Sequence, residues 1–187
     1  MRITGGRARS ILLKVPDRRQ LRPATERMRE AVFSHLGDRI IGARFLDVFA
    51  GTGAYGLEAL SRGAKSGVFV EKDRRTAAAL QSNLTAIAKS LNEAKLDCKL
   101  IESDIWRWKA PLTERFDFVF ADPPYGITAR HTEALFALFH RCLADQPSAR
   151  LIFEMPGTLN PCPPPWKVEH RLGHRDTAAP SVLIYRF

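Results

Sequence analysis

The sequence predicts an α/β fold: a doubly wound, mostly parallel sheet of seven strands with helices on both faces, preceded by a short basic N-terminal extension. Three observations lead to this fold. From residue 44 onward, apolar segments alternate with helical patterns. These segments are apolar at consecutive positions, as expected for strands that are buried on both faces. A glycine turn at residues 51–56 joins the first strand to the helix that follows it.

The N-terminal extension is expected to contain a hairpin and a helix. Residues 1–20 alternate loosely between apolar and polar side chains around Gly5–Gly6, which predicts a small hairpin or an extended arm. A helical pattern follows Pro23, with Thr25 as the expected N-cap and Gly37 as the residue that ends the helix.

The rest of the chain is expected to form the sheet. Strands are predicted at residues 45–50, 67–71, 98–103, 116–121 and 150–155, with a terminal pair at 167–172 and 181–187. Helices are predicted from the glycine turn to residue 63, at 74–90 and at 131–144, with a loop at 126–131 and a proline-rich connector at 156–165. We therefore divide the chain into the basic extension, residues 1–40, and the sheet domain, residues 41–187.

Positive charge is concentrated in the N-terminal quarter of the chain. The whole sequence has a formal net charge of +9. Residues 1–44 hold eleven basic residues against four acidic ones. Because crowded like charges oppose folding, a polyanionic partner is the simplest explanation, and a solvated basic face without a partner is the alternative.

The composition argues against membrane-spanning, disulfide-rich and zinc-binding proteins. No apolar run approaches the roughly 18 residues that a membrane span requires, and the first residues lack the apolar core of a secretory signal. Three scattered cysteines predict neither a disulfide framework nor a zinc site, so the cytoplasm is the expected location. We expect no metal at His170 and His174 either, since they flank a glycine in a strand-like segment.

Three successive strand ends predict a nucleoside cofactor. Gly51 and Gly53 would let the backbone approach a ligand closely, and the N-terminus of the next helix offers free N–H groups. Glu71 ends the second strand, where a carboxylate can accept both hydroxyl hydrogens of a ribose. Asp104 follows the third strand and can accept from the amino group of an adenine. The predicted cofactor contacts are Asp47, Gly51, Thr52, Gly53, Glu71, Lys72, Asp104 and Ile105.

The glycine turn leaves the kind of nucleoside open. The pattern Gly51-x-Gly53-x-x-Gly56 matches the dinucleotide-binding fingerprint, and Glu71 has the spacing expected for NAD. On this motif alone, an NAD-dependent dehydrogenase is a serious alternative.

The tetrapeptide Asp122-Pro123-Pro124-Tyr125 at the end of the fourth strand favours methyl transfer to the amino group of a nucleobase. Such an amine is a poor nucleophile because its lone pair is delocalised into the ring. The Asp122 carboxylate and the Pro123 carbonyl can accept both amine hydrogens, while the prolines fix the backbone. Tyr125 offers a face on which the base can stack. A rigid turn at the strand end is the alternative explanation of this sequence.

These motifs resemble a known family, the bacterial small-subunit ribosomal RNA (guanine-N2) methyltransferases, within the class I S-adenosylmethionine-dependent methyltransferases. The resemblance covers nearly the whole chain. It is carried by Arg2-Ile3-x-Gly5-Gly6 with Arg9, by Leu21-Arg22-Pro23-x-Thr25-x-Arg27-x-Arg29-Glu30-x-x-Phe33, by the run from Phe49 to Ala64, and by Asp122–Tyr125. The sequence departs from the family pattern at Ser10, Ala24 and Tyr55, where glycine, threonine and leucine are usual.

The resemblance implies a Rossmann-like fold that uses S-adenosylmethionine to methylate N2 of guanine 966 in 16S ribosomal RNA. It implies ribosomal RNA, in the small ribosomal subunit or its assembly intermediate, as the partner. RNA contacts are expected from Arg7, Arg9, Arg22 and Arg27, and we expect a monomer. Two alternatives stay open: a DNA adenine-N6 methyltransferase, which uses the same Asp-Pro-Pro-Tyr logic, and a catalytically inactive RNA-binding protein.

Overall fold

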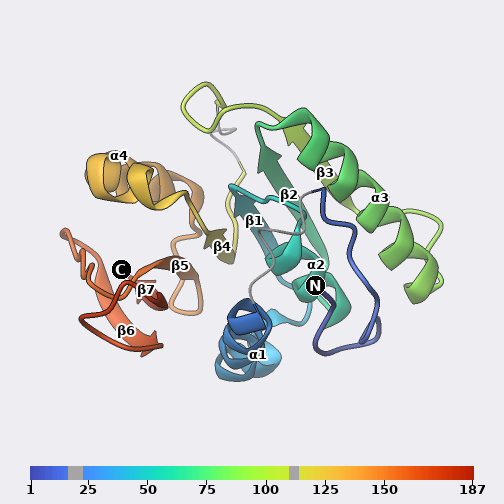
Figure 1. Ribbon diagram of the computed structural model, residues 1–187, viewed down its shortest axis with the longest axis horizontal. Coiled ribbons are helices and arrows are strands. Elements are labelled where there is room, and N and C mark those ends of the chain that lie inside the picture. Colours follow the sequence, from blue (N-terminus) through green and yellow to red (C-terminus); the bar gives the residue numbers. More distant parts are fainter. Residues whose placement is uncertain (17–22, 110–113) are drawn as a thin grey trace.

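The computed structural model describes residues 1–16, 23–109 and 114–187, and within these ranges seven strands form one sheet (Figure 1). The order across the sheet is β3-β2-β1-β4-β5-β7-β6. β7 runs antiparallel to both of its neighbours, and the other pairings are parallel. The strands are β1 (Arg44–Val48), β2 (Ser66–Glu71), β3 (Cys98–Glu102), β4 (Phe118–Ala121), β5 (Arg150–Pro156), β6 (Lys167–Leu172) and β7 (Pro180–Arg186). The predicted doubly wound, mostly parallel sheet is confirmed.

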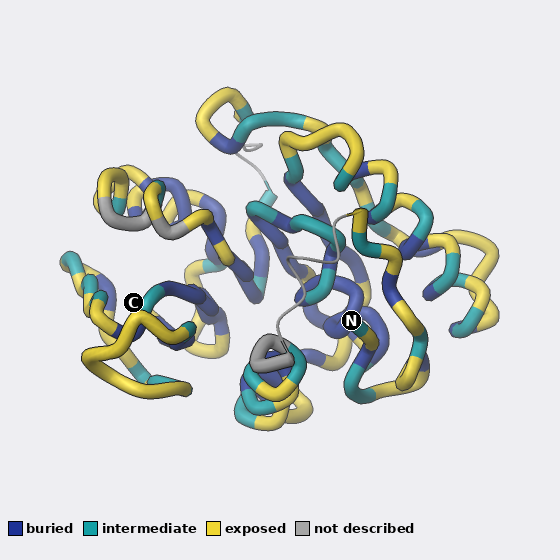
Figure 2. The backbone as a smooth tube through the Cα atoms, viewed as in Figure 1, coloured by how far each residue is buried: buried dark blue, intermediate teal, exposed yellow. Residues whose placement is uncertain are grey.

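Helices cover both faces of the sheet, and the strands between them are buried (Figure 2). Alternate residues of β1 show the two layers. Phe45 belongs to the core shared with α1 (Pro23–Leu36), α2 (Ala54–Ser61) and α3 (Arg74–Leu91). Leu46 and Val48 belong to the core shared with α4 (Tyr125–Cys142). A short 3-10 helix, η2 (Gly37–Ile40), follows α1, so Gly37 ends that helix as predicted.

The N-terminal segment forms the predicted small hairpin. The backbone N–H of Ile3 donates to the carbonyl of Ile11 at 3.0 Å, and that of Leu13 donates to the carbonyl of Met1 at 3.0 Å. Ile3 and Leu13 are buried in the same core as α2 and α3. At the turn, Ser10 has a φ of +73°, a conformation that favours the glycine usual at this position of the family. The hairpin is therefore packed against the sheet domain along its length.

A buried carboxylate anchors this hairpin. Glu58 of α2 accepts hydrogen bonds from the backbone N–H groups of Thr4 and Gly5, each at 2.8 Å. The guanidinium groups of Arg29 and Arg62 lie 3.2 Å and 2.8 Å from its oxygens. Burial opposes ionisation of Glu58, but these donors outweigh it and lower the pKa of its carboxyl. Arg29 is thus a buried ion-pair partner of Glu58, although it is one of the eleven basic residues counted in the N-terminal quarter of the chain.

Two local predictions are wrong. Thr25 was expected to cap α1, but the helix begins at Pro23, so Thr25 lies inside it. Proline suits the first helical position because its fixed φ is helical and its missing N–H would have no partner there. Residues 126–131 were expected to be a loop, but α4 begins at Tyr125. The break comes instead at His131, whose φ of −129° interrupts the helix.

Candidate active site at the carboxyl edge of the sheet

Two sequence motifs meet at one edge of the sheet because their strands are neighbours. β1 pairs with β4 in parallel, with Val48 opposite Ala121. The turn at Gly51 begins three residues after Val48, and Asp122 directly follows Ala121. Neighbouring strands lie about 4.8 Å apart. Both motifs therefore leave the same edge side by side, as the site proposed from the sequence requires.

The glycines of the turn serve different purposes. Gly53 has a φ of +84°, and a Cβ on it would lie 2.2 Å from Leu80 Cδ1, so both its conformation and its packing require glycine. A Cβ on Gly56 would lie 2.3 Å from a ring carbon of Phe69, so this glycine lets α2 pack closely on the sheet. A Cβ on Gly51 would meet nothing closer than 3.9 Å. The space beside Gly51 is open to a ligand.

Glu71 ties the end of β2 to the glycine turn. Its Oε2 accepts from the backbone N–H of Gly51 at 2.8 Å, and its Oε1 accepts from that of Asp73 at 2.8 Å. Each carboxylate oxygen has two lone pairs, so both can accept a further hydrogen bond. A pair of ribose hydroxyl groups matches that capacity. The half-buried Glu71 thus fits the role predicted for it and also stabilises the turn.

The third strand end lies beside Glu71. The backbone N–H of Ser103 donates to the Glu71 carbonyl at 3.0 Å, and Asp104 follows directly. Asp104 Oδ1 accepts from the N–H of Trp106 at 2.9 Å, and Lys72 Nζ lies 4.0 Å from its Oδ2. Ile105 is buried against the sheet. The structure therefore brings Gly51, Glu71, Lys72 and Asp104 together along one edge, which fits a bound nucleoside.

Asp47 is placed differently from the other predicted cofactor contacts. It is a buried residue of β1, and its Oδ2 accepts from the backbone N–H of Gly56 at 2.9 Å. Burial raises the pKa of Asp47 to about 8, the Gly56 N–H lowers it, and the negative charge of Glu71 raises it further. Asp47 thus holds the first turn of α2 through Gly56, and burial disfavours the charged form of its carboxyl.

The loop after β4 begins with an acid that is followed by two prolines. Asp122 is exposed and Pro123 is buried, and the backbone of Pro124 is extended, with a φ of −52° and a ψ of 133°. The Pro124 carbonyl accepts from the N–H of Ile127 at 2.8 Å, which fixes the start of α4. The side chain of Tyr125 lies outside the described part of the chain.

Sequence reasoning missed a buried pair beneath this loop. Tyr55 and Glu154 are both buried, and the Tyr55 hydroxyl donates to Glu154 Oε2 at 2.8 Å. Burial and the negative charges of Glu154 and Asp122 raise the pKa of Tyr55 well above its ordinary value. The available signals were an acid at the end of the apolar run RLIFEM and a tyrosine where the family has leucine. Neither signal predicts that the two residues meet.

Arg7, one of the arginines assigned to RNA, lies away from this edge. Arg7 Nη2 donates to the carbonyl of Leu91, the last residue of α3, at 2.8 Å. α3 begins beside Glu71 and has 18 residues, so Arg7 lies about 27 Å along the helix from that end. Arg9 and Arg27 are exposed, and Arg22 lies outside the described residues.

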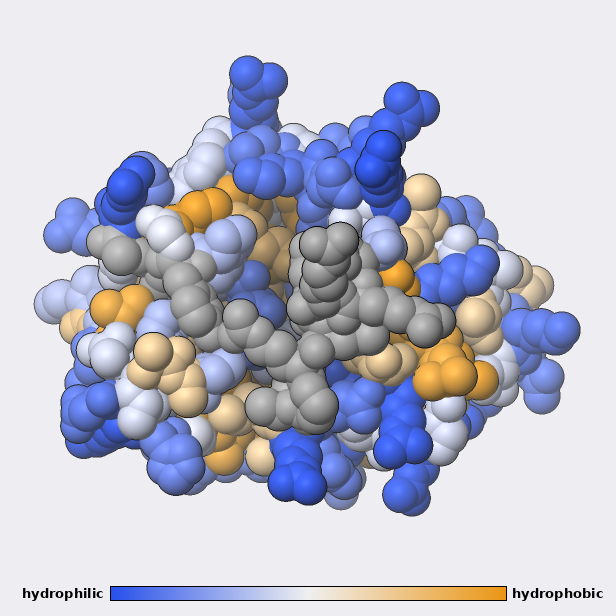
Figure 3. Space-filling model, in the orientation of Figure 1, coloured by the Kyte–Doolittle hydropathy of each residue, from blue (hydrophilic) through white to orange (hydrophobic). Residues whose placement is uncertain are grey.

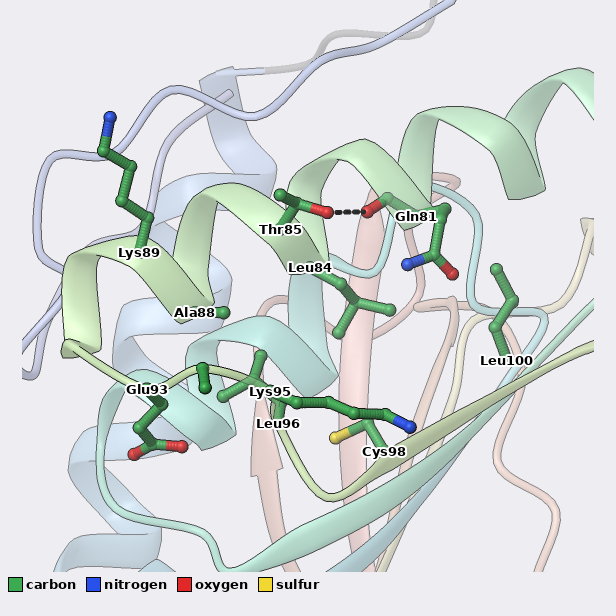
Figure 4. Close-up of a pocket in the computed structure, with 11 residues that line it drawn as sticks. Gln81, Leu84, Thr85, Ala88, Lys89, Glu93, Lys95, Leu96, Cys98 and Leu100 are labelled. Atoms are coloured by element: carbon green, nitrogen blue, oxygen red, sulfur yellow. Dashed lines mark hydrogen bonds between the residues drawn. The ribbon is translucent and has the colours of Figure 1, made fainter.

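A groove elsewhere on the molecule holds none of the predicted site residues. It has a volume of about 480 Å³ and lies between α3 and the edge strand β3 (Figure 4). Leu84 and Ala88 of the helix face Leu96 and Leu100 across it.

The described ranges show no metal site and no membrane helix. Within them, no group of three or more His, Cys, Asp or Glu residues could hold a metal ion. No helix in the same ranges is long and apolar enough to cross a membrane. Cys98, Cys142 and Cys162 are free thiols.

Strand order and site together define a class of protein. A sheet ordered 3-2-1-4-5-7-6 with an antiparallel β7, a glycine turn after β1 and acids after β2 and β3 is the fold of the class I S-adenosylmethionine-dependent methyltransferases. A putative methyltransferase solved in complex with SAH shares this fold, with a TM-score of 0.63 at 12% identity over 81% of this chain and 48% of that one. S-adenosylmethionine is the cofactor of this class.

The family follows from the comparison with known proteins. Residues 1–171 match the family described as conserved hypothetical protein 95, and the chain belongs to this family. The structure of the putative methyltransferase yhhF from Escherichia coli superposes with a TM-score of 0.81 at 31% identity, covering 99% of this chain and 96% of that one. The ribosomal RNA small subunit methyltransferase D of Escherichia coli strain K12 is 38% identical over 125 residues, which are 67% of this chain and 60% of that protein.

Proposed function

We propose that the protein transfers a methyl group from S-adenosylmethionine to the N2 amine of guanine 966 in 16S ribosomal RNA. The substrate would be the small ribosomal subunit or its assembly intermediate, and the protein would act on it in the cytoplasm as a monomer. The pairing of β1 with β4 carries the proposal, because it sets the Gly51 turn beside Asp122. The name of the Escherichia coli relative supports ribosomal RNA as the substrate. Guanine N2 and its position rest on the resemblance of the loop and the N-terminal signature to the guanine-N2 family.

The cofactor would be held by the three strand ends. Glu71 has the free lone pairs for both ribose hydroxyls, and Gly51 has the open space for close backbone approach. Asp104 would accept from the adenine amino group, with Ile105 beside it. Thr52, Gly53 and Lys72 would complete the contacts, while Asp47 would act by holding α2 through Gly56. When bound, the cofactor supplies a sulfonium methyl group that is already a good electrophile.

The loop after β4 would prepare the target amine. Asp122 and the Pro123 carbonyl would accept its two hydrogens, which draws the nitrogen toward a pyramidal geometry and frees its lone pair. As the new N–CH₃ bond forms and the S–CH₃ bond breaks, the nitrogen becomes positively charged and loses one proton to Asp122 or to water. Tyr125 would stack on the base. The main task of these residues is alignment, since proximity alone can supply a large part of a rate enhancement.

The proposal is tested by mapping the methylated nucleotide. The purified protein and methyl-labelled S-adenosylmethionine are incubated with small subunits from a strain that lacks the protein, and mass spectrometry locates the label. We expect one methyl group on N2 of guanine 966, incorporated about 100- to 1000-fold more slowly by Asp122→Asn. Label on another nucleotide would refute the assigned position, and label in duplex DNA alone would replace ribosomal RNA as the substrate. A protein that binds RNA but not S-adenosylmethionine would be the inactive RNA-binding alternative.

A further inference from the structure

An exposed aromatic pair lies beside the candidate active site. Trp106 is two residues after Asp104, and its side chain is 45% exposed. Its ring centroid is 5.3 Å from that of His131, with an angle of 57° between the ring planes. His131 is also exposed and belongs to α4, the helix that begins at Tyr125 in the loop after β4. The pair therefore connects the cofactor side of the site with the side assigned to the target base.

Hydrogen bonds fix the backbone of the turn that carries Trp106. The Asp104 carbonyl accepts from the N–H groups of Arg107 and Trp108, each at 2.9 Å, and Asp104 Oδ1 accepts from the N–H of Trp106. Ile105 is buried in the core shared with α4, and Trp108 packs against the same core. The turn is thus anchored by its neighbours while Trp106 itself projects into solvent.

Basic residues flank the pair directly. Arg107 follows Trp106 and Arg130 precedes His131, and both are exposed. The acid nearest in sequence to Trp106, Asp104, has Lys72 Nζ at 4.0 Å. The exposed surface is hydrophilic over much of the face in Figure 3, with apolar side chains only in scattered patches. An exposed tryptophan next to an exposed arginine at the edge of the site has the chemistry of a nucleic-acid contact, because bases stack on aromatic faces and cations bind the phosphates.

We propose that Trp106 and His131 form a stacking platform for an unpaired RNA base next to the target nucleotide, with Arg107 and Arg130 close to the adjoining phosphates. The inference rests on the proposed function and deepens it, since it names single-stranded RNA as the structure bound at this edge. A base that leaves its stack exposes the neighbouring base. The platform replaces that lost stacking surface. It also supplies an RNA contact at the reacting edge, which Arg7 does not reach.

The test compares Trp106→Ala, Trp106→Phe and His131→Ala with the wild-type protein. Ile41→Ala is the matched control, because Ile41 is an apolar residue with 63% exposure at the amino end of β1, the opposite edge of the sheet. The probe is a single-stranded oligoadenylate of about ten nucleotides, within the usual site size for such binding. Fluorescence anisotropy gives its affinity, calorimetry gives the affinity for S-adenosylmethionine, and KM and kcat are measured with small subunits.

We expect Trp106→Ala to weaken oligoadenylate binding about tenfold and to raise KM, with kcat and cofactor affinity unchanged. Trp106→Phe should recover most of the affinity because it keeps an aromatic face, His131→Ala should lie between the two, and Ile41→Ala should behave like the wild-type protein. The probe should quench tryptophan fluorescence in the wild-type protein more than in Trp106→Phe.

Two results would overturn the inference. Unchanged oligoadenylate affinity in Trp106→Ala would exclude the platform, even if binding to whole subunits fell, because that loss would indicate a ribosomal protein contact. A fall in S-adenosylmethionine affinity with unchanged oligoadenylate binding would make Trp106 a cover over the cofactor. Oligoadenylate binding needs no catalysis, so a wild-type protein that binds the probe through Trp106 but transfers no methyl group would refute the proposed function alone.

Discussion

The Tyr55 hydroxyl donates a 2.8 Å hydrogen bond to the Glu154 carboxylate in the interior beneath Asp122. β4 pairs with β5 so that Ala121 lies opposite Phe153, which brings the next residues of the two strands, Asp122 and Glu154, side by side. The Tyr55 ring also stacks on Phe120, with 5.6 Å between the centroids. The helix that follows the glycine turn is thus joined to β4 and to β5, beside the loop that begins at Asp122.

Tyr55→Phe should lower the free energy of unfolding by about 1–3 kcal/mol, because it removes a donor from a buried charged acceptor. Chemical denaturation measures the change. Tyr185→Phe is the control: the buried Tyr185 hydroxyl donates to the neutral carbonyl of Pro161 at 2.7 Å, where a loss of about 0.5–1.5 kcal/mol is expected. In a Glu154→Gln background the cost of Tyr55→Phe should shrink. An equal cost in both backgrounds would show that the Tyr55–Glu154 bond does not carry the effect.

Asp122→Asn should reduce kcat about 100- to 1000-fold, because the amide offers the target amine a weaker acceptor than a carboxylate. The affinity for S-adenosylmethionine, measured by calorimetry, should stay at the wild-type value. Asp145→Asn changes an exposed acid outside the site in the same way and should leave kcat unaltered. Wild-type turnover by Asp122→Asn would remove Asp122 from the mechanism.

Glu71→Ala should weaken the binding of S-adenosylmethionine by about 1–3 kcal/mol, since charge-assisted hydrogen bonds to the ribose are lost. Glu71→Gln should lose less, because it keeps one acceptor for the N–H of Gly51. Glu102 is the register partner of Glu71 on β3 and is exposed, so Glu102→Ala is the matched control. Calorimetry that gave both alanine variants the same affinity would contradict the ribose assignment.

The stability of the protein should fall as the pH rises through the range set by Asp47. Its pKa is raised from 3.8 to about 8 in the folded protein, so the folded state holds a proton that the unfolded chain releases above about pH 4. The contribution of the Asp47 proton to the free energy of unfolding is complete below about pH 4 and is lost as the pH rises through about 8. Asp47→Asn should flatten this dependence by up to about 1.4 kcal/mol per pH unit, measured by denaturation at several pH values. Parallel curves for the two proteins would show that Asp47 is ionised in the fold.

Arg9→Glu combined with Arg27→Glu should raise KM for small subunits and reduce its dependence on salt, since fewer counterions are released on binding. Both side chains are exposed, so the fold should be retained. The control is Arg175→Glu combined with Arg186→Glu. It carries the same change of charge on β7 and on the turn before that strand. If the two double variants had the same salt slope, the N-terminal extension would not be an RNA contact.

Most of the sheet could be predicted because buried parallel strands are apolar at consecutive positions, and β1 and β2 lie within two residues of their expected bounds. The edge that holds Gly51, Glu71 and Asp122 followed from the strand pattern. The role of Glu154 could not be predicted, because only the pairing of β4 with β5 sets it beside Asp122. Nor could the position of Arg7, since its bond to the carbonyl of Leu91 joins residues 84 positions apart.

The distant contacts of the N-terminal hairpin determine when this part of the protein can fold during synthesis. The N–H of Thr4 donates to Glu58, which is 54 residues later in the chain. Arg7 donates to the carbonyl of Leu91, which is later still. At roughly 5–20 residues per second, the interval before Leu91 is made is about 4–17 s. For those seconds Ile3 and Leu13 have no core to enter, so the hairpin is translated well before the elements on which it docks.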